Sequence, residues 1–208
     1  MKSKKVTIVD YGMGNIWSVA SAFKYLNCDI EITSDSRRVE KSQLLILPGV
    51  GSFKKAMNSL KKLGLDEALT KRVSDDKVKI LGICLGMQLM GTSSTEDGMT
   101  IGLNLIPAAV DRFTPNEVGT RKIPHVGFDR VQSKQGSILF RNLTGNDDFY
   151  FVHSYRMLSR DLFGSLAMCN YGIDFLAAYE FENVFATQFH PEKSQTNGLQ
   201  LLKNFLSG

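Results

Sequence analysis

Cysteine is scarce in this chain: its 208 residues include only three, at positions 28, 84 and 169. Because they are odd in number and far apart, they indicate neither a disulfide framework nor a zinc site. Few, widely separated thiols are typical of proteins that work in a reducing compartment. We therefore expect a cytoplasmic protein.

Long hydrophobic runs are also missing. No segment reaches the roughly 18 consecutive apolar residues that a membrane-spanning helix needs. Near the N-terminus, the apolar run from Val6 to Val9 is too short for the core of a signal peptide and is followed directly by Asp10. Neither an export signal nor a membrane anchor is expected.

Charge of one sign is not concentrated anywhere in the chain. It has 25 Lys and Arg against 21 Asp and Glu, so its net charge is only +4, with no long run of like charge. Nucleic-acid-binding proteins usually carry a stronger basic bias, so no nucleic-acid partner is expected. The 43% hydrophobic content provides enough apolar material for one core, and we predict a single domain over residues 1–208.

The first half of the chain alternates segments typical of buried strands with segments of helical periodicity. Strands are predicted at 6–9, 29–33, 44–47 and 78–83, and helices at 16–26, from Ser52 onward, at about 66–73 and at 85–90. Strands that are apolar throughout and alternate with helices favour a parallel sheet covered on both faces.

The second half is richer in strands joined by short turns, which favours antiparallel pairing for several of them. The predicted strands are Lys122–Val131, Phe149–Met157, Ser165–Tyr171, Phe175–Phe181 and Val184–Phe189, and an amphipathic helix over Leu199–Leu206 closes the chain. The predicted fold is therefore α/β with three layers, in which a mixed, mainly parallel central sheet is flanked by helices.

The segment LGICLGMQLM, residues 81–90, places Cys84 at a sharp turn between a buried strand and a helix. Gly82 and Gly86 stand two residues to either side, which is the spacing of a nucleophile elbow. Such a turn presents the side chain at the carboxyl end of the sheet, where the N-terminus of the following helix favours thiolate over thiol. A cysteine packed between strand and helix would satisfy the same five residues, so this pattern alone leaves both interpretations open.

A cysteine nucleophile needs a base, and the chain has three histidines. His190 follows a predicted strand and is separated from Glu192 by one proline. Side chains two residues apart in an extended chain project to the same side, so Glu192 can orient the His190 imidazole. A structural role, or one at the edge of a substrate site, is expected for His153, and a packing role for His125.

Another loop at the same sheet edge, Pro48–Ser52 with the sequence PGVGS, ends a buried strand and is rich in glycine. Its backbone amides can approach a ligand closely, so it is a candidate for the second oxyanion donor beside the amide of Leu85. An ordinary strand-to-helix turn would have the same composition. The pair Gly12 and Gly14 lacks the third glycine of a dinucleotide-binding loop, because position 17 is Trp17, which argues against nucleotide binding.

Together, the segments GICLGMQLM around Cys84, PGVGS at 48–52 and QFHPEKSQ at 188–195 resemble the class I (triad) glutamine amidotransferases. Within that family, the segments VDYGMGN, IPHVGF, FYFVHSY and NYG further resemble the glutaminase subunits of imidazole glycerol phosphate synthases. The resemblance runs from about residue 5 to the C-terminus. It implies the amidotransferase fold, which is flavodoxin-like.

The resemblance also implies a role for each matching residue. Cys84 would attack the side-chain amide of glutamine, His190 would act as general base and acid, and Glu192 would orient His190. Backbone groups of Gly51 and Leu85 would surround the oxyanion. The residues at positions that hold the glutamine substrate are Gln88, Glu96, Ser154 and Tyr155. An exposed helix position for Gln88 and a solvated loop for Glu96 are the alternatives.

A partner and products are implied in the same way. Ammonia would pass to a synthase subunit with a (β/α)8 barrel, which forms a heterodimer with the glutaminase. There it would react with the nucleotide-derived substrate PRFAR to give imidazole glycerol phosphate and AICAR in histidine biosynthesis. Lys193 matches a family position near the docking face. No metal or organic cofactor is implied.

One segment departs from the family, whose members usually have Trp where this chain has Phe128 in the sequence PHVGF. Related glutaminases supply ammonia to other synthases, including sugar-modifying enzymes of surface polysaccharide synthesis, so a different ammonia acceptor stays open. A cysteine peptidase or a catalytically silent regulatory subunit on the same fold is a third hypothesis.

A glutamine-mimicking electrophile tests the assignment of the nucleophile. Intact mass measurement should show one adduct on the native chain and none on Cys84→Ala, because the sulfur of Cys84 is the atom expected to attack. Labelling that persists in the variant would refute the assignment.

Overall fold

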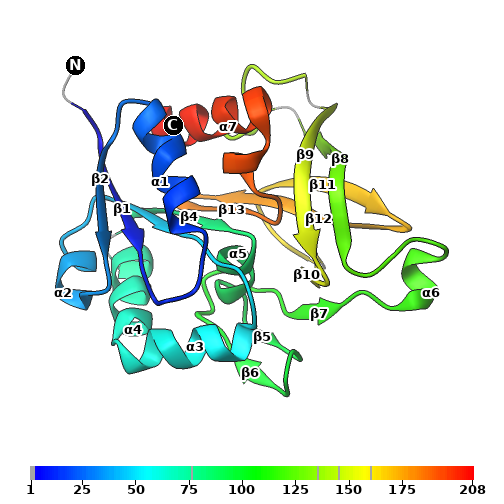
Figure 1. Cartoon of the computed structure of the whole chain (residues 1–208), viewed down its shortest axis with the longest axis horizontal. Coiled ribbons are helices and arrows are strands. Elements are labelled where there is room, and N and C mark those ends of the chain that lie inside the picture. The colour runs from blue at the N-terminus through cyan, green and yellow to red at the C-terminus, as the bar shows by residue number, and fades with distance from the viewer. Residues whose placement is uncertain (1–2, 76, 135, 145, 160) are drawn as a thin grey trace.

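A computed structural model describes residues 3–75, 77–134, 136–144, 146–159 and 161–208. Nine of its strands form one sheet, in the order β2-β1-β3-β4-β13-β12-β11-β8-β9 (Figure 1). Their bounds are β1 Lys5–Val9, β2 Asp29–Thr33, β3 Leu44–Leu47, β4 Lys79–Ile83, β8 His125–Ser133, β9 Asn146–His153, β11 Ser165–Tyr171, β12 Ile173–Phe181 and β13 Val184–Thr187.

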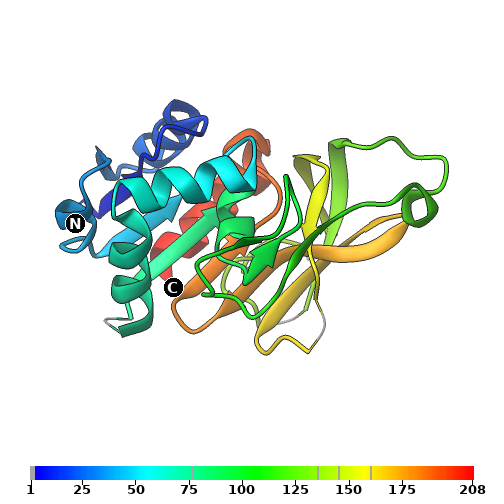
Figure 2. The same cartoon turned by 90° about the horizontal axis from the view of Figure 1, so that it is seen from below.

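The sheet has a parallel half and an antiparallel half. The strands from β2 to β13 in that order run parallel, and the remaining strands pair antiparallel. Parallel strands need long crossover connections, which helices of the first half supply, whereas antiparallel strands are joined by short turns. Seen from below, the antiparallel half extends away from the blue N-terminal helices (Figure 2). This mixed sheet between helices is the predicted three-layer α/β fold.

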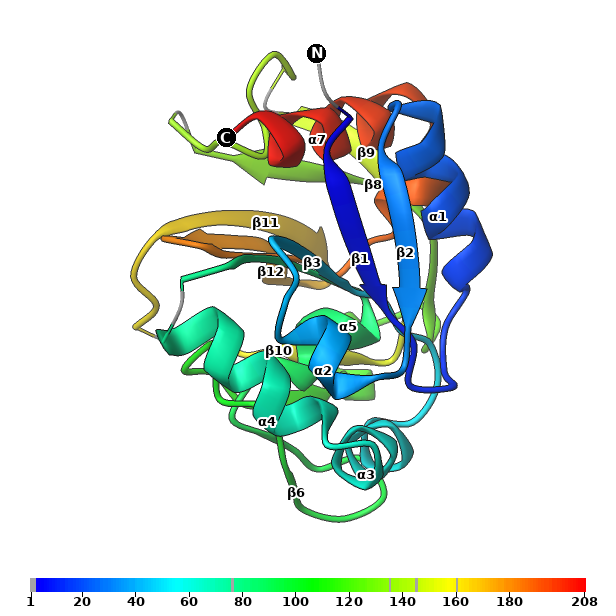
Figure 3. The ribbon, with the colours of Figure 1, turned by 90° about the vertical axis from the view of Figure 1, so that its left-hand side faces the viewer.

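Two sets of helices cover the two faces of the sheet (Figures 1 and 3). One face carries α1 (Ile16–Tyr25) and α7 (Gln195–Ser207), and the other carries α3 (Phe53–Lys62), α4 (Leu65–Thr70) and α5 (Leu85–Leu89). Alternate residues of β3 serve the two faces, since Ile46 packs with the first set and Leu45 and Leu47 pack with the second. This explains why the strand is apolar throughout.

Several shorter elements complete the chain. They are α2 (Ser36–Val39), the π-turn η1 (Lys71–Asp75), α6 (Pro115–Val118) and the 3-10 turn η2 (Pro191–Lys193). Within the described ranges, no helix has both the length and the apolar character that crossing a membrane would require.

A second, smaller sheet has the order β10-β7-β5-β6 and was not predicted. Its strands are β5 Ser93–Ser94, β6 Thr100–Ile101, β7 Val110–Arg112 and β10 Tyr155–Met157. The prediction of one strand over Phe149–Met157 is therefore wrong, because the chain changes sheets at Ser154. His153 ends β9 in the large sheet and Tyr155 begins β10 in the small one. Both pieces have strand-like composition, so the change of sheet left no mark on the pattern.

Segments with predicted functional residues meet at one edge of the large sheet, because neighbouring parallel strands end there together. β3 and β4 pair Leu47 with Gly82, and β4 and β13 pair Ile83 with Thr187. The PGVGS loop, the elbow turn and the segment leading to His190 therefore leave adjacent strands side by side.

Gly86 lets α5 approach β3 more closely than any other residue would allow. A Cβ atom at this position would lie 1.7 Å from the Leu47 carbonyl oxygen, which is far inside any non-bonded contact. A Cβ atom at Gly82, on the strand side of the turn, would lie 2.9 Å from the Met87 nitrogen. Both glycines of the elbow motif are therefore packing requirements.

Gly86→Ala should destabilise the fold by at least about 3 kcal/mol, because the new methyl group collides with main-chain atoms of β3. Gly64→Ala is the matched control: Gly64 has a φ of +63°, and a Cβ there would lie 3.9 Å from the nearest atom, Ser36 Oγ. Its cost is that of the left-handed backbone alone, about 1–2 kcal/mol. Urea unfolding followed by circular dichroism measures both free energies, and equal losses would contradict the packing role of Gly86.

Candidate active site

Cys84 lies between β4 and α5 in a backbone conformation that residues other than glycine rarely adopt. Its φ is 54° and its ψ is −109°, a strained combination that persists only where the surroundings hold it. They hold it on both sides, since the Cys84 amide donates to the Thr187 carbonyl at 2.7 Å and its carbonyl accepts from the Gln88 amide at 3.2 Å. The turn thus has the strained geometry expected of a nucleophile elbow.

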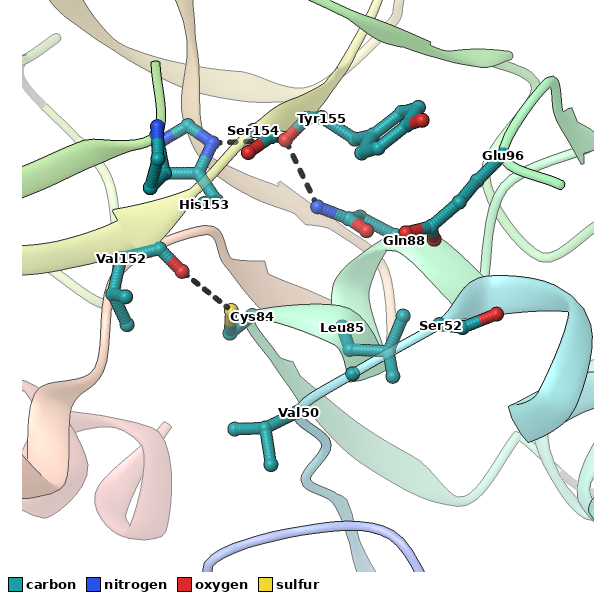
Figure 4. A pocket seen from close by; sticks show the side chains of 12 residues that line it. Val50, Ser52, Cys84, Leu85, Gln88, Glu96, Val152, His153, Ser154 and Tyr155 are labelled. Carbon is teal, nitrogen blue, oxygen red and sulfur yellow. Dashed lines mark hydrogen bonds between the residues drawn. The ribbon is translucent and has the colours of Figure 1, made fainter. Parts of the chain in front are cut away.

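The Cys84 side chain faces a cavity of about 480 Å³, roomy enough for a small ligand (Figure 4). The cavity is lined by Val50, Gly51, Ser52, Cys84, Leu85, Gln88, Glu96, Pro124, Val152, His153, Ser154 and Tyr155. The structure therefore brings every residue predicted for the oxyanion and for the substrate to one cavity, from segments far apart in the sequence.

His190 and Glu192 form a buried pair. His190 Nδ1 lies 2.7 Å from Glu192 Oε1, and the two side chains are 2% and 1% exposed. The backbone of His190 is fixed as well, because its amide donates to the Tyr150 carbonyl at 2.9 Å and its carbonyl accepts from Ser194 Oγ at 2.7 Å. Since Nδ1 faces the carboxylate, Nε2 is the nitrogen left for chemistry. Nε2 is buried and has no hydrogen-bond partner among the residues that the structure describes.

Opposing effects set the charge of His190. Burial by itself would lower the pKa of His190, but the Cys84 side chain and the Glu192 carboxylate outweigh it and raise this pKa to about 10. The imidazole is therefore protonated at neutral pH. Because the folded-state pKa lies above the ordinary value, this charge stabilises the fold in full below about pH 6.5. That contribution is lost as the pH rises through about 10.

Gln88 projects from α5 toward the cavity, and its side chain is held in place. Nε2 donates one hydrogen bond to the Tyr155 carbonyl and one to Gln188 Oε1, both at 3.0 Å. These bonds use both N–H groups of the carboxamide, so Oε1, an acceptor, is the atom left for a ligand (Figure 4). Gln88 is only 5% exposed, so the alternative of an exposed helix position is wrong.

Glu96 belongs to a loop that docks on the N-terminus of α3. Its Oε2 accepts from the Phe53 amide at 2.7 Å, and the Asp97 carboxylate accepts from Ser52 Oγ at 2.9 Å. Burial raises the pKa of Glu96, the Phe53 amide partly offsets this, and the Asp97 charge adds to it. The loop is therefore anchored to the helix, and the freely solvated alternative is wrong.

Gly51 and Leu85 border the cavity next to Cys84. Gly51 has a φ of +106°, a conformation for which glycine is required. The start of its loop is tied down by Tyr11, whose Oη donates to the Pro48 carbonyl at 2.7 Å. Leu85 is the first residue of α5, so its amide has no acceptor within the helix and can serve a ligand.

Gln188 is a residue that the sequence analysis missed. It is fully buried, and its Nε2 lies 3.7 Å from Cys84 Sγ. Gln188 stands two residues before His190, just as Glu192 stands two residues after it. The alternation of side chains that singled out Glu192 could therefore have found Gln188 as well.

An exposed cluster adjoins the His190 segment, and we call it the aromatic patch: Val126, Phe128, Tyr150 and Lys193. The Phe128 and Tyr150 rings meet edge to face at 5.5 Å, and Lys193 Nζ lies 5.8 Å from the Tyr150 ring centroid. Phe128 is 48% exposed and Val126 is 56% exposed. Because the Tyr150 carbonyl also accepts from the His190 amide, the patch is joined directly to the buried pair.

Comparisons with known proteins agree with this geometry. The sequence model of the family "Glutamine amidotransferase class-I" matches residues 7–208. PurLQS from Thermotoga maritima has a similar fold, with a TM-score of 0.74 over 98% of both chains at 15% identity. A glutamine amidotransferase from the same organism has a TM-score of 0.63, covering 99% of this chain and 84% of that one at 15% identity. Fold and site thus define a class I glutamine amidotransferase.

Curated relatives are more similar in sequence. Imidazole glycerol phosphate synthase subunit HisH 1 of Parasynechococcus marenigrum is 43% identical over 205 residues, which are 98% of this chain and 97% of the relative. Subunit HisH 1 of Campylobacter jejuni is 44% identical over 200 residues, 96% of this chain and 98% of the relative. The chain belongs to the family of these HisH subunits within the class I glutamine amidotransferases.

His190 and His153 should depart in opposite directions from the ordinary titration of histidine. His190 should stay protonated through neutral pH, whereas burial lowers the pKa of His153 to about 3 and keeps that ring neutral. In Cys84→Ala, the pKa of His190 should fall, because one of the two groups that raise it is gone; Cys169→Ala serves as the control. Nitrogen-15 NMR of labelled histidines between about pH 5 and about pH 10 measures both rings. An unchanged His190 titration in Cys84→Ala would show that the two side chains do not interact.

Proposed function

We propose that this protein is the glutaminase subunit of an imidazole glycerol phosphate synthase. It hydrolyses L-glutamine to glutamate and supplies the ammonia to a synthase subunit. The observation that carries this proposal is the strained Cys84, whose side chain acts with Glu192 to raise the pKa of the buried His190, in a chain 43% identical to a HisH subunit over 98% of its length. The joint presence of thiol, imidazole and carboxylate argues against a silent regulatory subunit.

The first half of the reaction forms a thioester. Cys84 Sγ, as thiolate, bonds to the carboxamide carbon of glutamine, and the carbonyl electrons move to oxygen. Backbone amides of Leu85 and Gly51 stabilise this oxyanion. The protonated His190 then gives its Nε2 proton to the departing nitrogen, so the C–N bond breaks and ammonia leaves. Glu192 keeps Nδ1 oriented throughout.

The second half releases glutamate. Neutral His190 takes a proton from water while the water oxygen attacks the thioester carbon. The C–S bond then breaks, Cys84 regains its thiolate and His190 is again protonated. The product carboxylic acid loses its proton to solvent and leaves as glutamate. The free enzyme is therefore restored with the same charges that it began with.

The cavity offers groups that match the other end of glutamine. Oε1 of Gln88 is an acceptor, and Glu96 brings a carboxylate to the cavity, so both suit N–H donors of the substrate. Ser154 and Tyr155 border the cavity where the chain passes from one sheet to the other. We assign their strand edge to the α-carboxylate of glutamine.

The aromatic patch is the docking face that we propose for the (β/α)8 synthase subunit, with Lys193 as an interface residue. Aromatic side chains with a neighbouring cation are typical of protein interfaces. The heterodimer would then pass ammonia to PRFAR without releasing it, and the products would be imidazole glycerol phosphate and AICAR. We place the protein in the cytoplasm, which the three free cysteines Cys28, Cys84 and Cys169 support.

A second acceptor is supported by one observation. Phe128, the residue that replaces the usual tryptophan, lies in the aromatic patch, where a partner would touch it. A change there alters the partner while the glutamine chemistry stays the same. The alternative acceptor is a sugar-modifying synthase of surface polysaccharide formation. A cysteine peptidase is disfavoured because the cavity is matched to a free amino acid by Gln88 and Glu96.

Adding the (β/α)8 subunit and PRFAR should raise glutamine hydrolysis about tenfold or more over the slow rate of the isolated chain. The reason is that the partner completes the oxyanion site. Glutamate release measures the rate, and Lys193→Ala should weaken the stimulation, whereas Lys203→Ala, on α7, should not. No rise with PRFAR would favour the polysaccharide partner, and no glutamate under any condition would contradict the glutaminase itself.

A further inference from the structure

A hydrogen-bonded chain outside the triad ends on the nucleophile. Gln188 is fully buried, and its carboxamide lies between two side chains of the site. Its Nε2 points at Cys84 Sγ over 3.7 Å, and its Oε1 accepts from Gln88 Nε2 at 3.0 Å. Both ends of this carboxamide are therefore engaged, one of them by the sulfur that has to react.

The orientation of both carboxamides follows from one backbone carbonyl. The Tyr155 carbonyl can only accept, so the group of Gln88 that lies 3.0 Å from it must be Nε2. The second hydrogen of that nitrogen then goes to Gln188, which must present Oε1 to it. What remains for Cys84 is the N–H side of Gln188. The Gln188 side of the sulfur is therefore a donor, whereas the Val152 carbonyl, 3.9 Å from Sγ, is an acceptor that only a protonated thiol could use (Figure 4).

The same carbonyl anchors a pair of buried imidazoles. His153 Nδ1 lies 2.8 Å from the Tyr155 carbonyl, so this nitrogen carries a hydrogen. His153 is neutral, because burial holds its pKa at about 3, so its Nε2 accepts from His125 Nδ1 at 3.1 Å. His125 Nε2 in turn lies 2.7 Å from Asp129 Oδ2. Asp129 follows Phe128 of the aromatic patch in the sequence, so this chain of hydrogen bonds reaches the protein surface.

A donor aimed at sulfur has two physical effects. It favours the thiolate, because a hydrogen bond to a charged acceptor is stronger than one to a neutral thiol. It also fixes the direction of the sulfur, which an elbow residue needs if it is to meet a bound amide in line. A carboxamide that served packing alone would need neither this direction nor this neighbour.

We propose that Gln188 is a positioning residue for the nucleophile, and that the chain Asp129–His125–His153 acts through it by holding the Tyr155 carbonyl and Gln88 in place. This inference rests on the proposed function in taking Cys84 as the attacking atom. The QFHPE segment would then contribute three side chains to the site, namely Gln188, His190 and Glu192.

Gln188→Leu tests the donor, since it keeps the approximate size and removes the N–H group. Alkylation of Cys84 by iodoacetamide, followed by peptide mass spectrometry, should be about tenfold to a hundredfold slower near neutral pH. The pH profile of the alkylation rate should move to higher pH, which a packing defect would not cause. Gln188→Glu should show the same change more strongly, because it turns an acceptor toward the sulfur. Gln188→Met replaces either variant that fails to fold.

Thr187→Val is the matched control. Thr187 is equally buried in the same segment, and its Oγ1 donates to the Phe189 carbonyl at 3.0 Å without touching the sulfur. This variant should alkylate within about twofold of the native rate, even if it melts earlier. Equal rates in Gln188→Leu and the native protein, with the same pH profile, would overturn the proposal. Absence of labelling of native Cys84 by a glutamine-like diazoketone would instead sink the proposed function.

The outer end of the hydrogen-bonded chain, Asp129, can be tested separately. A substitution there leaves the core intact because the Asp129 side chain is 38% exposed. Asp129→Ala should slow alkylation of Cys84 by about twofold to tenfold. Asp129→Asn should restore the rate, since its carboxamide can keep a hydrogen bond to His125 Nε2. In the Gln188→Leu background, Asp129→Ala should have no further effect. An undiminished effect in that background, or none in the native one, would show that the imidazoles do not act through Gln188.

Discussion

The close approach of α5 to β3 is the constraint on which the site depends. Because Gly86 has no side chain, the helix packs directly against the Leu47 carbonyl, and the turn before it holds Cys84 at positive φ. Packing and backbone hydrogen bonds on both sides offset this strain. The outcome is a sulfur that stands at the carboxyl edge of the sheet and at the start of a helix.

Burial and hydrogen-bond partners then set the charge states of two histidines of the site. His190 and His153 are both nearly inaccessible, yet their charge states are opposite. His190 has the Glu192 carboxylate and Cys84 as partners, which raise its pKa to about 10 against the effect of burial. His153 is hydrogen-bonded to a backbone carbonyl and to another ring, so burial dominates and lowers its pKa to about 3. Of these two rings, only His190 is therefore charged at neutral pH.

The change of sheet at Ser154 builds the opposite wall of the cavity and links it to the surface. Before Ser154, β9 carries Tyr150, which belongs to the aromatic patch. The Tyr150 carbonyl accepts a hydrogen bond from the His190 amide. On the other side, the Tyr155 carbonyl accepts from both Gln88 and His153. One continuous stretch of chain therefore contacts the proposed docking face, His190 and the cavity. This gives a physical route by which a partner subunit can act on glutamine hydrolysis.

The sequence by itself determined what depends on near neighbours in the chain. The glycines around Cys84, the spacing of His190 and Glu192 and the apolar strands of the parallel half follow from local geometry, so the fold class and the Cys84 turn could be predicted. Only the tertiary structure decided that the chain changes sheets at Ser154 and that Gln188 lies against the Cys84 sulfur. It also decided that His125 pairs with His153, 28 positions away. These features depend on strand register and on which sheet each segment joins, and long-range packing fixes both without leaving a periodicity in any single strand.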